Sequence, residues 1–191
     1  MAPEEFLDRA ANFSLAVDGG AYKGLWTLPM AARFKRVIAF ELCPEWYYEL
    51  VLHTAELMGQ VVPLNIALGQ DELDIYYVGD KSPDSPIKRV WPAAGETGQP
   101  SVPVRMMRLD KFNLPALDFL KLDLQGFEVF ALKGAEKTIL KYRPLIHLEM
   151  DEGSQRTFDV VGKAQDLLLS WGYDKLIRAA DEELWGFHAA R

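Results

Sequence analysis

Cysteine, long apolar runs and net positive charge are what this 191-residue sequence has little of. Cys43 is the only cysteine, which excludes an internal disulfide and a zinc site built from several thiolates. The apolar stretches are as long as strands and fall far short of the roughly 20 residues that span a bilayer. With 21 basic and 28 acidic residues, the formal charge of −7 opposes attraction to nucleic acid or to an anionic membrane. We therefore expect neither a polynucleotide nor a membrane as partner.

The sequence also shows no internal repeat, and its first residues do not look like a secretory signal. Glu4 and Glu5 stand where such a signal carries positive charge, and no apolar segment follows them. We therefore expect a cytoplasmic protein. The length and the 49% hydrophobic content suit one domain over residues 1–191, with an N-terminal helix within 1–13.

Apolar runs of strand length alternate with segments of helical spacing along the chain. The pattern predicts strands at 14–18, 36–41, 61–67, 73–77, 102–109, 118–123, 144–150, 173–178 and 184–188, and helices at 23–33, 44–58, 125–141 and 157–170. Such alternation is typical of an α/β fold with a doubly wound, mostly parallel sheet and helices on both faces. The last two strands follow each other closely, so they must form an antiparallel hairpin.

Residues 79–103 are rich in proline and glycine and are too long for a simple connection. We expect a lid or a substrate loop there. Lys81, Lys88, Arg89, Arg105 and Arg108 gather in or near this segment, as a local basic patch or, more simply, as a solvated surface.

The segment 15–24 carries the main functional signal. An apolar strand ends at Asp18, the glycine pair that includes Gly20 follows, and a helical pattern then begins. This order is typical of a turn in which the backbone must approach a ligand closely. The next apolar run, 37–41, ends at Glu41, at about the distance of the neighbouring parallel strand end. A carboxylate there can accept hydrogen bonds from both hydroxyls of a ribose. The two strand ends therefore predict a site for a nucleotide-type cofactor.

Three details favour S-adenosylmethionine over a dinucleotide. The spacing from Asp18 through Gly20 to Gly24 differs from G-x-G-x-x-G, and an acid at the strand end would repel a pyrophosphate. The cationic amino group of the methionine part tolerates that acid, and its carboxylate can rest on amides of the turn or of the following helix. A terminal antiparallel hairpin is unnecessary in a plain dinucleotide domain.

At this point the chain resembles the FkbM-type methyltransferases of class I over residues 16–173. The matching motifs are V-D-G-G-A-Y-K-G at 17–24, I-A-F-E at 38–41, A-L-G at 67–69, R-L-D at 108–110, L-K-L-D-L-Q-G-F-E at 120–128, L-K-G-A at 132–135 and H-L-E at 147–149. The resemblance implies a Rossmann-like, seven-stranded methyltransferase fold, S-adenosylmethionine as donor, and a hydroxyl acceptor on a small metabolite or sugar. The sequence departs from the family at Tyr22 and Lys23, which replace the usual Asn and aliphatic pair, and at Gln125, where Glu is common.

Each candidate residue has an expected role. The amides of Gly20, Ala21 and Tyr22 would contact the methionine part, and Asp18 would hold the turn or the amino group. Glu41 would bind the ribose. The full set expected to bind the donor is Asp18, Gly19, Gly20, Ala21, Tyr22, Gly24, Glu41, Leu42, Ala67, Leu68 and Asp123, with Ala67 and Leu68 bordering adenine.

A hydroxyl acceptor must lose a proton, and a carboxylate near the transferred methyl can take it. Asp123 is the first candidate for this catalytic base and Glu149, at the end of the adjacent strand, is the second. No spacing of acids fixes a metal site, and we expect activity without one. His147 lies within an apolar strand, which favours a structural role. Two alternatives stay open, an NAD-dependent oxidoreductase and a methyltransferase-like binding protein without turnover.

Overall fold

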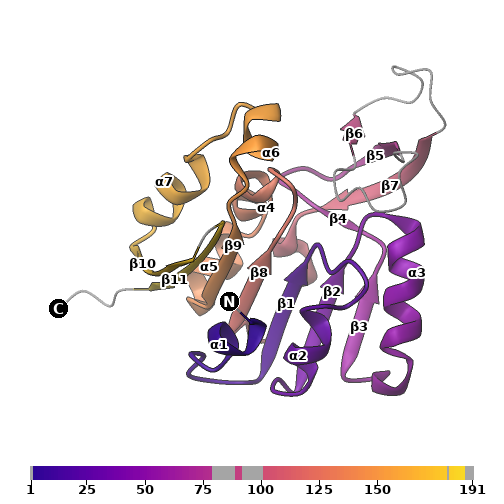
Figure 1. Cartoon of the computed structure of the whole chain (residues 1–191), viewed down its shortest axis with the longest axis horizontal. Helices are drawn as coiled ribbons and strands as arrows, with labels where there is room; N and C mark the ends of the chain where they lie inside the picture. Colours follow the sequence, from indigo (N-terminus) through magenta and orange to yellow (C-terminus); the bar gives the residue numbers. More distant parts are fainter. Residues whose placement is uncertain (1, 79–88, 92–100, 180, 188–191) are drawn as a thin grey trace.

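The structure is a computed structural model that describes residues 2–78, 89–91, 101–179 and 181–187. Its main element is a seven-stranded sheet in the order β10-β11-β9-β8-β1-β2-β3 (Figure 1). The strands are β1 (Leu15–Gly19), β2 (Arg36–Phe40), β3 (Val61–Leu64), β8 (Phe119–Leu122), β9 (Leu145–Glu149), β10 (Tyr173–Ala179) and β11 (Glu182–Phe187). Neighbouring strands from β9 to β3 pair in parallel, and β11 is antiparallel to both of its neighbours. The predicted doubly wound sheet with an antiparallel C-terminal hairpin is confirmed.

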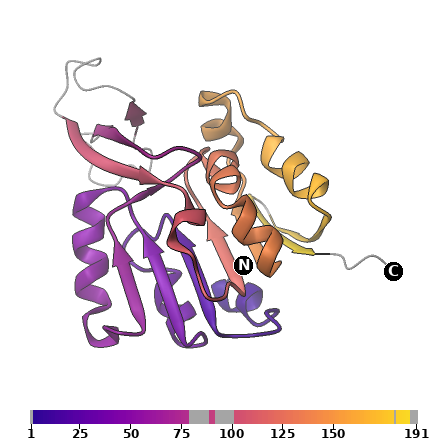
Figure 2. The same cartoon turned by 180° about the vertical axis from the view of Figure 1, so that it is seen from behind.

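Helices cover both faces of this sheet (Figures 1 and 2). They are α1 (Pro3–Leu7), α2 (Thr27–Ala31), α3 (Pro44–His53), α4 (Glu128–Gly134), α5 (Glu136–Tyr142), α6 (Glu152–Thr157) and α7 (Lys163–Ser170), with single 3₁₀ turns η1 (Ala55–Leu57) and η2 (Leu109–Phe112). Alternate residues of β1 point to opposite faces of the sheet, where they belong to two separate hydrophobic cores. Ala16 packs with Phe6 and Met30, and Val17 packs with Leu132. Burial on both faces explains why the strands read as continuous apolar runs.

A second sheet was not predicted. It contains β4 (Ala67–Leu68), β7 (Ser101–Met107), β5 (Leu73–Val78) and β6 (Arg89–Trp91), in that order, and lies above the carboxyl ends of β2 and β3 in Figure 1. The single strand expected at 61–67 is wrong, because the chain leaves the main sheet after Leu64 and β4 pairs with β7. Asn65 stabilises this change of direction, since its side chain donates to the carbonyls of Glu41 and Leu42 at 2.8 and 3.0 Å.

Several helices are shorter than predicted. The helix expected from 23 begins only at Thr27, because Gly20, Tyr22 and Gly24 adopt left-handed backbone with φ of 74, 51 and 99°. The helix expected over 125–141 is divided into α4 and α5 at Ala135. Of the predicted lid at 79–103, residues 79–88 and 92–100 lie outside the described residues, and 89–91 and 101–103 belong to β6 and β7. Among the described helices, none has the length and apolarity to cross a bilayer.

Candidate active site

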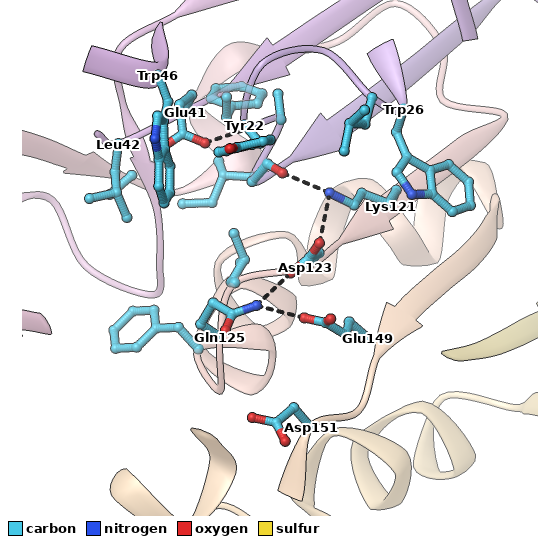
Figure 3. A pocket seen from close by; sticks show the side chains of 18 of the residues that line it. Tyr22, Trp26, Glu41, Leu42, Trp46, Lys121, Asp123, Gln125, Glu149 and Asp151 are labelled. Atoms are coloured by element: carbon cyan, nitrogen blue, oxygen red, sulfur yellow. Dashed lines mark hydrogen bonds and ion pairs between the residues drawn. The ribbon is translucent and has the colours of Figure 1, made fainter. Parts of the chain in front are cut away.

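A cavity of about 740 Å³ opens at the carboxyl ends of β1, β2, β8 and β9 (Figure 3). The strand order reverses between β1 and β8, the point at which open α/β sheets bind their ligands. The volume lies in the range of pockets for small molecules and cofactors. Of the predicted residues, those that line the cavity are Gly20, Ala21, Tyr22, Glu41, Leu42, Ala67, Leu68, Asp123 and Glu149.

The turn after β1 lies against the neighbouring strand ends. A Cβ at Gly20 would stand 1.9 Å from the carbonyl oxygen of Asp123, so glycine is required there for packing of the protein itself, in addition to any ligand. The amides of Gly20 and Ala21 both donate to the Phe40 carbonyl at 2.9 Å, and the Tyr22 amide donates to Glu41 at 2.8 Å. The amides expected to contact a methionine part therefore already have partners within the protein.

Glu41 lines the cavity and is only 4% exposed. Its two carboxylate oxygens accept from the amides of Tyr22 and Cys43 at 2.8 and 2.7 Å. Burial raises the pKa of Glu41 to about 7, against the lowering effect of these two amides. Each carboxylate oxygen has a second lone pair, so the residue can still accept hydroxyl groups from a ligand. Gly20 and Glu41 thus lie at the ends of adjacent strands. The hydrogen bond from the Tyr22 amide to Glu41 connects the turn after β1 to the end of β2.

Asp18, Gly19 and Gly24 do not line the cavity. Asp18 is fully buried, accepts from the Thr27 hydroxyl at 2.7 Å and pairs with the ammonium of Lys121 at 3.2 Å. Lys121 in turn donates to the Gly20 carbonyl at 2.7 Å. Asp18 was expected to hold either the turn or the amino group of the donor. The geometry favours the first role, in which Asp18 acts through Lys121.

Asp123 follows β8 and Glu149 is the last residue of β9, and the two strands are paired with Leu122 opposite Leu148. The side-chain amide of Gln125 lies between them and donates to Asp123 at 3.0 Å and to Glu149 at 2.8 Å (Figure 3). Lys121 is 3.5 Å from Asp123. The result is a carboxyl pair held by one amide and one ammonium.

The two carboxyl groups of this pair have different affinities for protons. Burial and the hydrogen bond and charge of Asp123 raise the pKa of Glu149 to about 9. Burial alone would raise the pKa of Asp123 too, but the charge of Lys121 and the hydrogen bonds outweigh it and the pKa lies below its ordinary value. At neutral pH one proton therefore resides on Glu149 while Asp123 is ionised.

Aromatic side chains complete the walls. Trp46, from the first turn of α3, packs edge-on against Tyr22 with ring centroids 4.6 Å apart, beside Glu41. Trp26 lines the opposite end (Figure 3). Sequence reasoning missed Trp46, Trp26, Lys121, Gln125 and Asp151 as lining residues. A lysine inside the apolar run 119–122 was the one available signal, because a buried lysine needs acidic partners.

His147 lies outside the cavity lining, as its structural interpretation requires. It is 1% exposed and packs against Phe6 and Trp26, and burial lowers the pKa of its imidazole. Among the described residues, no group of three or more His, Cys, Asp or Glu side chains is placed to hold a metal ion.

Solved structures share this architecture. A methyltransferase FkbM from Methylobacillus flagellatus KT superposes with a TM-score of 0.64 at 18% identity, over 92% of this chain and 44% of that one. A putative rRNA methylase from Clostridium thermocellum gives 0.56 at 10% identity, over 98% and 94%. The putative methyltransferase SMU.1697c from Streptococcus mutans, solved in complex with SAH, gives 0.55 at 13%, over 95% and 92%. The chain thus spans less than half of the Methylobacillus protein.

No curated protein matches the sequence. The family model for the methyltransferase FkbM domain, however, matches residues 18–175, from the end of β1 into β10. This range contains the turn after β1, both carboxyl groups of the Asp123–Glu149 pair and the parallel strands that present them. The chain therefore belongs to the FkbM family of S-adenosylmethionine-dependent methyltransferases.

Proposed function

We propose that this chain transfers a methyl group from S-adenosylmethionine to a hydroxyl on a small metabolite or sugar. The observation that carries the proposal is one cavity that joins a ribose-type acceptor, Glu41, to a proton-accepting pair, Asp123 and Glu149. The cavity connects the ends of β2 and β9 across the switch point of the sheet. Donor and acceptor can therefore meet within one enclosed space.

The donor fits the end of the cavity near β2. Glu41 would accept the ribose hydroxyls, while Leu42, Ala67, Leu68 and the ring of Trp46 offer apolar surface for adenine. The methionine part would extend along the turn at Gly20 toward Asp123, where an ionised carboxylate suits its ammonium group. When bound, this donor supplies an electrophilic methyl carbon, so the protein's own work is to position the acceptor and to remove its proton.

Glu149 is the stronger proton acceptor of the pair, because its pKa is about 9 while that of Asp123 is lowered. Glu149 can accept the hydroxyl proton only after it has lost its own proton, so turnover should rise with pH from 7 towards 9. Glu149→Gln should lower kcat by about a hundredfold and abolish that rise. A pH–rate profile checks both; an unchanged profile in the variant would remove Glu149 from the role.

Charge argues against a polynucleotide acceptor, although the Clostridium thermocellum neighbour is named as a putative rRNA methylase. The chain carries a net charge of −7. Of the basic patch considered in the sequence, Arg105 and Arg108 pair with Asp74 and Asp110 at 3.2 and 3.5 Å. These arginines are therefore already engaged by acids of the protein itself.

Titration calorimetry with S-adenosylhomocysteine and with NAD tests the donor assignment. We expect binding of the first and none of the second, and the reverse result would establish the oxidoreductase alternative. Release of S-adenosylhomocysteine from a mixed pool of hydroxylated metabolites and sugars tests turnover. Donor binding with no product from any acceptor pool would leave a binding protein in place of an enzyme.

A further inference from the structure

We propose that the acceptor carries an ammonium group in addition to the hydroxyl that is methylated, as amino sugars and amino alcohols do. This inference rests on the proposed methyltransferase function and names the acceptor class. It starts from the end of the cavity beyond β8, away from Glu41 and Trp46 (Figure 3). This acceptor end is defined by Trp26, Asp123, Glu149, Asp151 and Asp181.

Negative charge at the acceptor end exceeds what the protein neutralises. Asp151 follows β9 and its carboxylate faces the cavity in Figure 3, while Asp181 precedes β11. Asp151 caps α6 by accepting from the amides of Gly153 and Ser154 and from the Ser154 hydroxyl. These bonds favour the ionised carboxylate, so its negative charge is permanent at neutral pH.

Lys121 is the one basic side chain among the described residues that line the cavity. Its ammonium donates to the Gly20 carbonyl at 2.7 Å and forms ion pairs with Asp18 at 3.2 Å and Asp123 at 3.5 Å. Only 2% of its side chain is exposed, so its charge is already offset by these two acids and does not balance a phosphate or carboxylate of an acceptor. An anionic acceptor would therefore meet uncompensated negative charge.

The indole of Trp26 adds a second attraction for a cation. Trp26 lines the acceptor end and is partly exposed. Trp26 is fixed by contact with Phe6 and His147, at centroid distances of 5.9 and 4.3 Å. Carboxylates and an indole ring that line the same cavity are a combination that recognises organic ammonium groups.

The ammonium is recognised and does not react. In the step, the hydroxyl oxygen forms the new bond to the methyl carbon, and the bond from that carbon to sulfur breaks with its electron pair going to sulfur. The hydroxyl proton passes to the Asp123–Glu149 pair, and the acceptor keeps its positive charge throughout. Asp151 and Asp181 are thus specificity residues, separate from the proton acceptors.

The test uses acceptors matched in shape and different in charge: glucosamine, N-acetylglucosamine and glucuronate, with amino alcohols and their N-acetyl forms. Transfer of a labelled methyl group and binding to the protein loaded with S-adenosylhomocysteine, by ligand-observed NMR, are both measured. We expect the ammonium members to be preferred by about tenfold or more over their neutral forms, and the anionic member to be the poorest.

Asp151→Asn is the decisive variant, because it removes the charge while asparagine, which also caps helices, keeps the oxygen that can accept the Ser154 amide and loses only the one that accepts the Gly153 amide. It should lower kcat/KM for ammonium acceptors about five- to tenfold, with little change for neutral ones and with donor affinity unchanged. Glu152→Gln is the matched control: it removes the same charge one position away, at an exposed residue that does not line the cavity.

The proposal fails if neutral or anionic acceptors match the ammonium members, or if no ammonium member is bound or methylated by protein that binds S-adenosylhomocysteine. It also fails if Asp151→Asn weakens the donor instead, since the carboxylate would then serve the donor's own positive charge. Absence of S-adenosylhomocysteine binding would instead refute the proposed function on which the inference rests.

Discussion

The loops after the paired strands β1 and β8 lie next to each other at the cavity and share two features. Each contains left-handed backbone, at Gly20 and Tyr22 in the first and at Gln125 and Gly126 in the second. Each is also held by a buried glutamate that accepts two backbone amides: Glu41 accepts one from the first loop and one from Cys43, and Glu128 accepts both from the second loop. In both glutamates burial raises the pKa to about 7.

The difference between the two glutamates is their access to the cavity. Glu41 lines it, and Glu128 does not. One arrangement of carboxylate and amides is therefore used twice, once where a ligand can add further hydrogen bonds and once as a support of the backbone alone. The pair allows binding and structural effects to be separated by matched substitutions.

The largest effects should come from the glycines of the two loops. A Cβ at Gly20 would lie 1.9 Å from the Asp123 carbonyl oxygen, and one at Gly126 would lie 2.5 Å from that of Ser154. Each Gly→Ala variant should lose about 3 kcal/mol or more of unfolding free energy, or fail to fold. Urea unfolding measures this.

Gly59→Ala is the control for those two variants. Its φ is 98°, and nothing lies within 4 Å of an added Cβ. It should therefore cost only the backbone strain, about 1 kcal/mol. If the loop glycines cost no more than Gly59, the close approach of the two strand ends is wrong.

The two glutamates should then separate in ligand affinity. Gln at position 41 replaces one of two oxygens that each accept an amide, whereas at position 128 both amides bond to a single oxygen, which Gln retains. Glu41→Gln should also lose hydrogen bonds from the ribose, and should raise the Kd for S-adenosylhomocysteine by about 10- to 100-fold. Glu128→Gln should leave that Kd within about threefold, by calorimetry. Equal effects would remove the ribose assignment of Glu41.

The comparison of the two loops also shows how much of the site can be predicted from sequence patterns. Apolar runs and their terminal acids predicted the parallel sheet, and they placed Glu41, Asp123 and Glu149 at strand ends, where they line one cavity. A strand end is a local property of the chain. Its partners are not, since the hydrogen bond from Lys121 to the Gly20 carbonyl joins residues 101 positions apart.

Two features could not be predicted from the sequence because they depend on contacts between segments that are distant along the chain. The amides of Gly20 and Ala21 donate to the Phe40 carbonyl, a pairing that exists only once β1 and β2 are side by side. The chain leaves the main sheet at Asn65, whose side chain donates to the carbonyls of Glu41 and Leu42, although apolar residues lie on both sides of it in the sequence. Periodicity reports which residues are buried, and it does not report which strand they pair with.

The stability of both loops should fall as pH rises. The pKa of each glutamate is about 7 in the folded protein and about 4.5 in its ordinary state, so the folded protein binds protons more tightly between these values. The resulting stabilisation is complete below pH 4.5 and is lost as pH rises through 7, on the order of 3 kcal/mol per group. Relative to wild type, Glu128→Gln should therefore gain stability between pH 5 and pH 8 in urea unfolding. A constant difference across that range would mean that the carboxylate is ionised at low cost.

The smallest effect should follow removal of divalent metal ions. Asp123 and Glu149 are the carboxyl pair in the cavity that most resembles a metal-binding pair. The side-chain amide of Gln125, however, already donates to both, and Lys121 offsets the charge of Asp123. A cation would have to displace that amide, so methyl transfer should change by less than about twofold after treatment with a chelator. Gln125→Glu removes the donor and adds a third carboxylate, and it is the variant in which Mg²⁺ binding should appear by calorimetry. Loss of wild-type activity on chelation, restored by Mg²⁺, would show that the amide gives way to a metal ion during turnover.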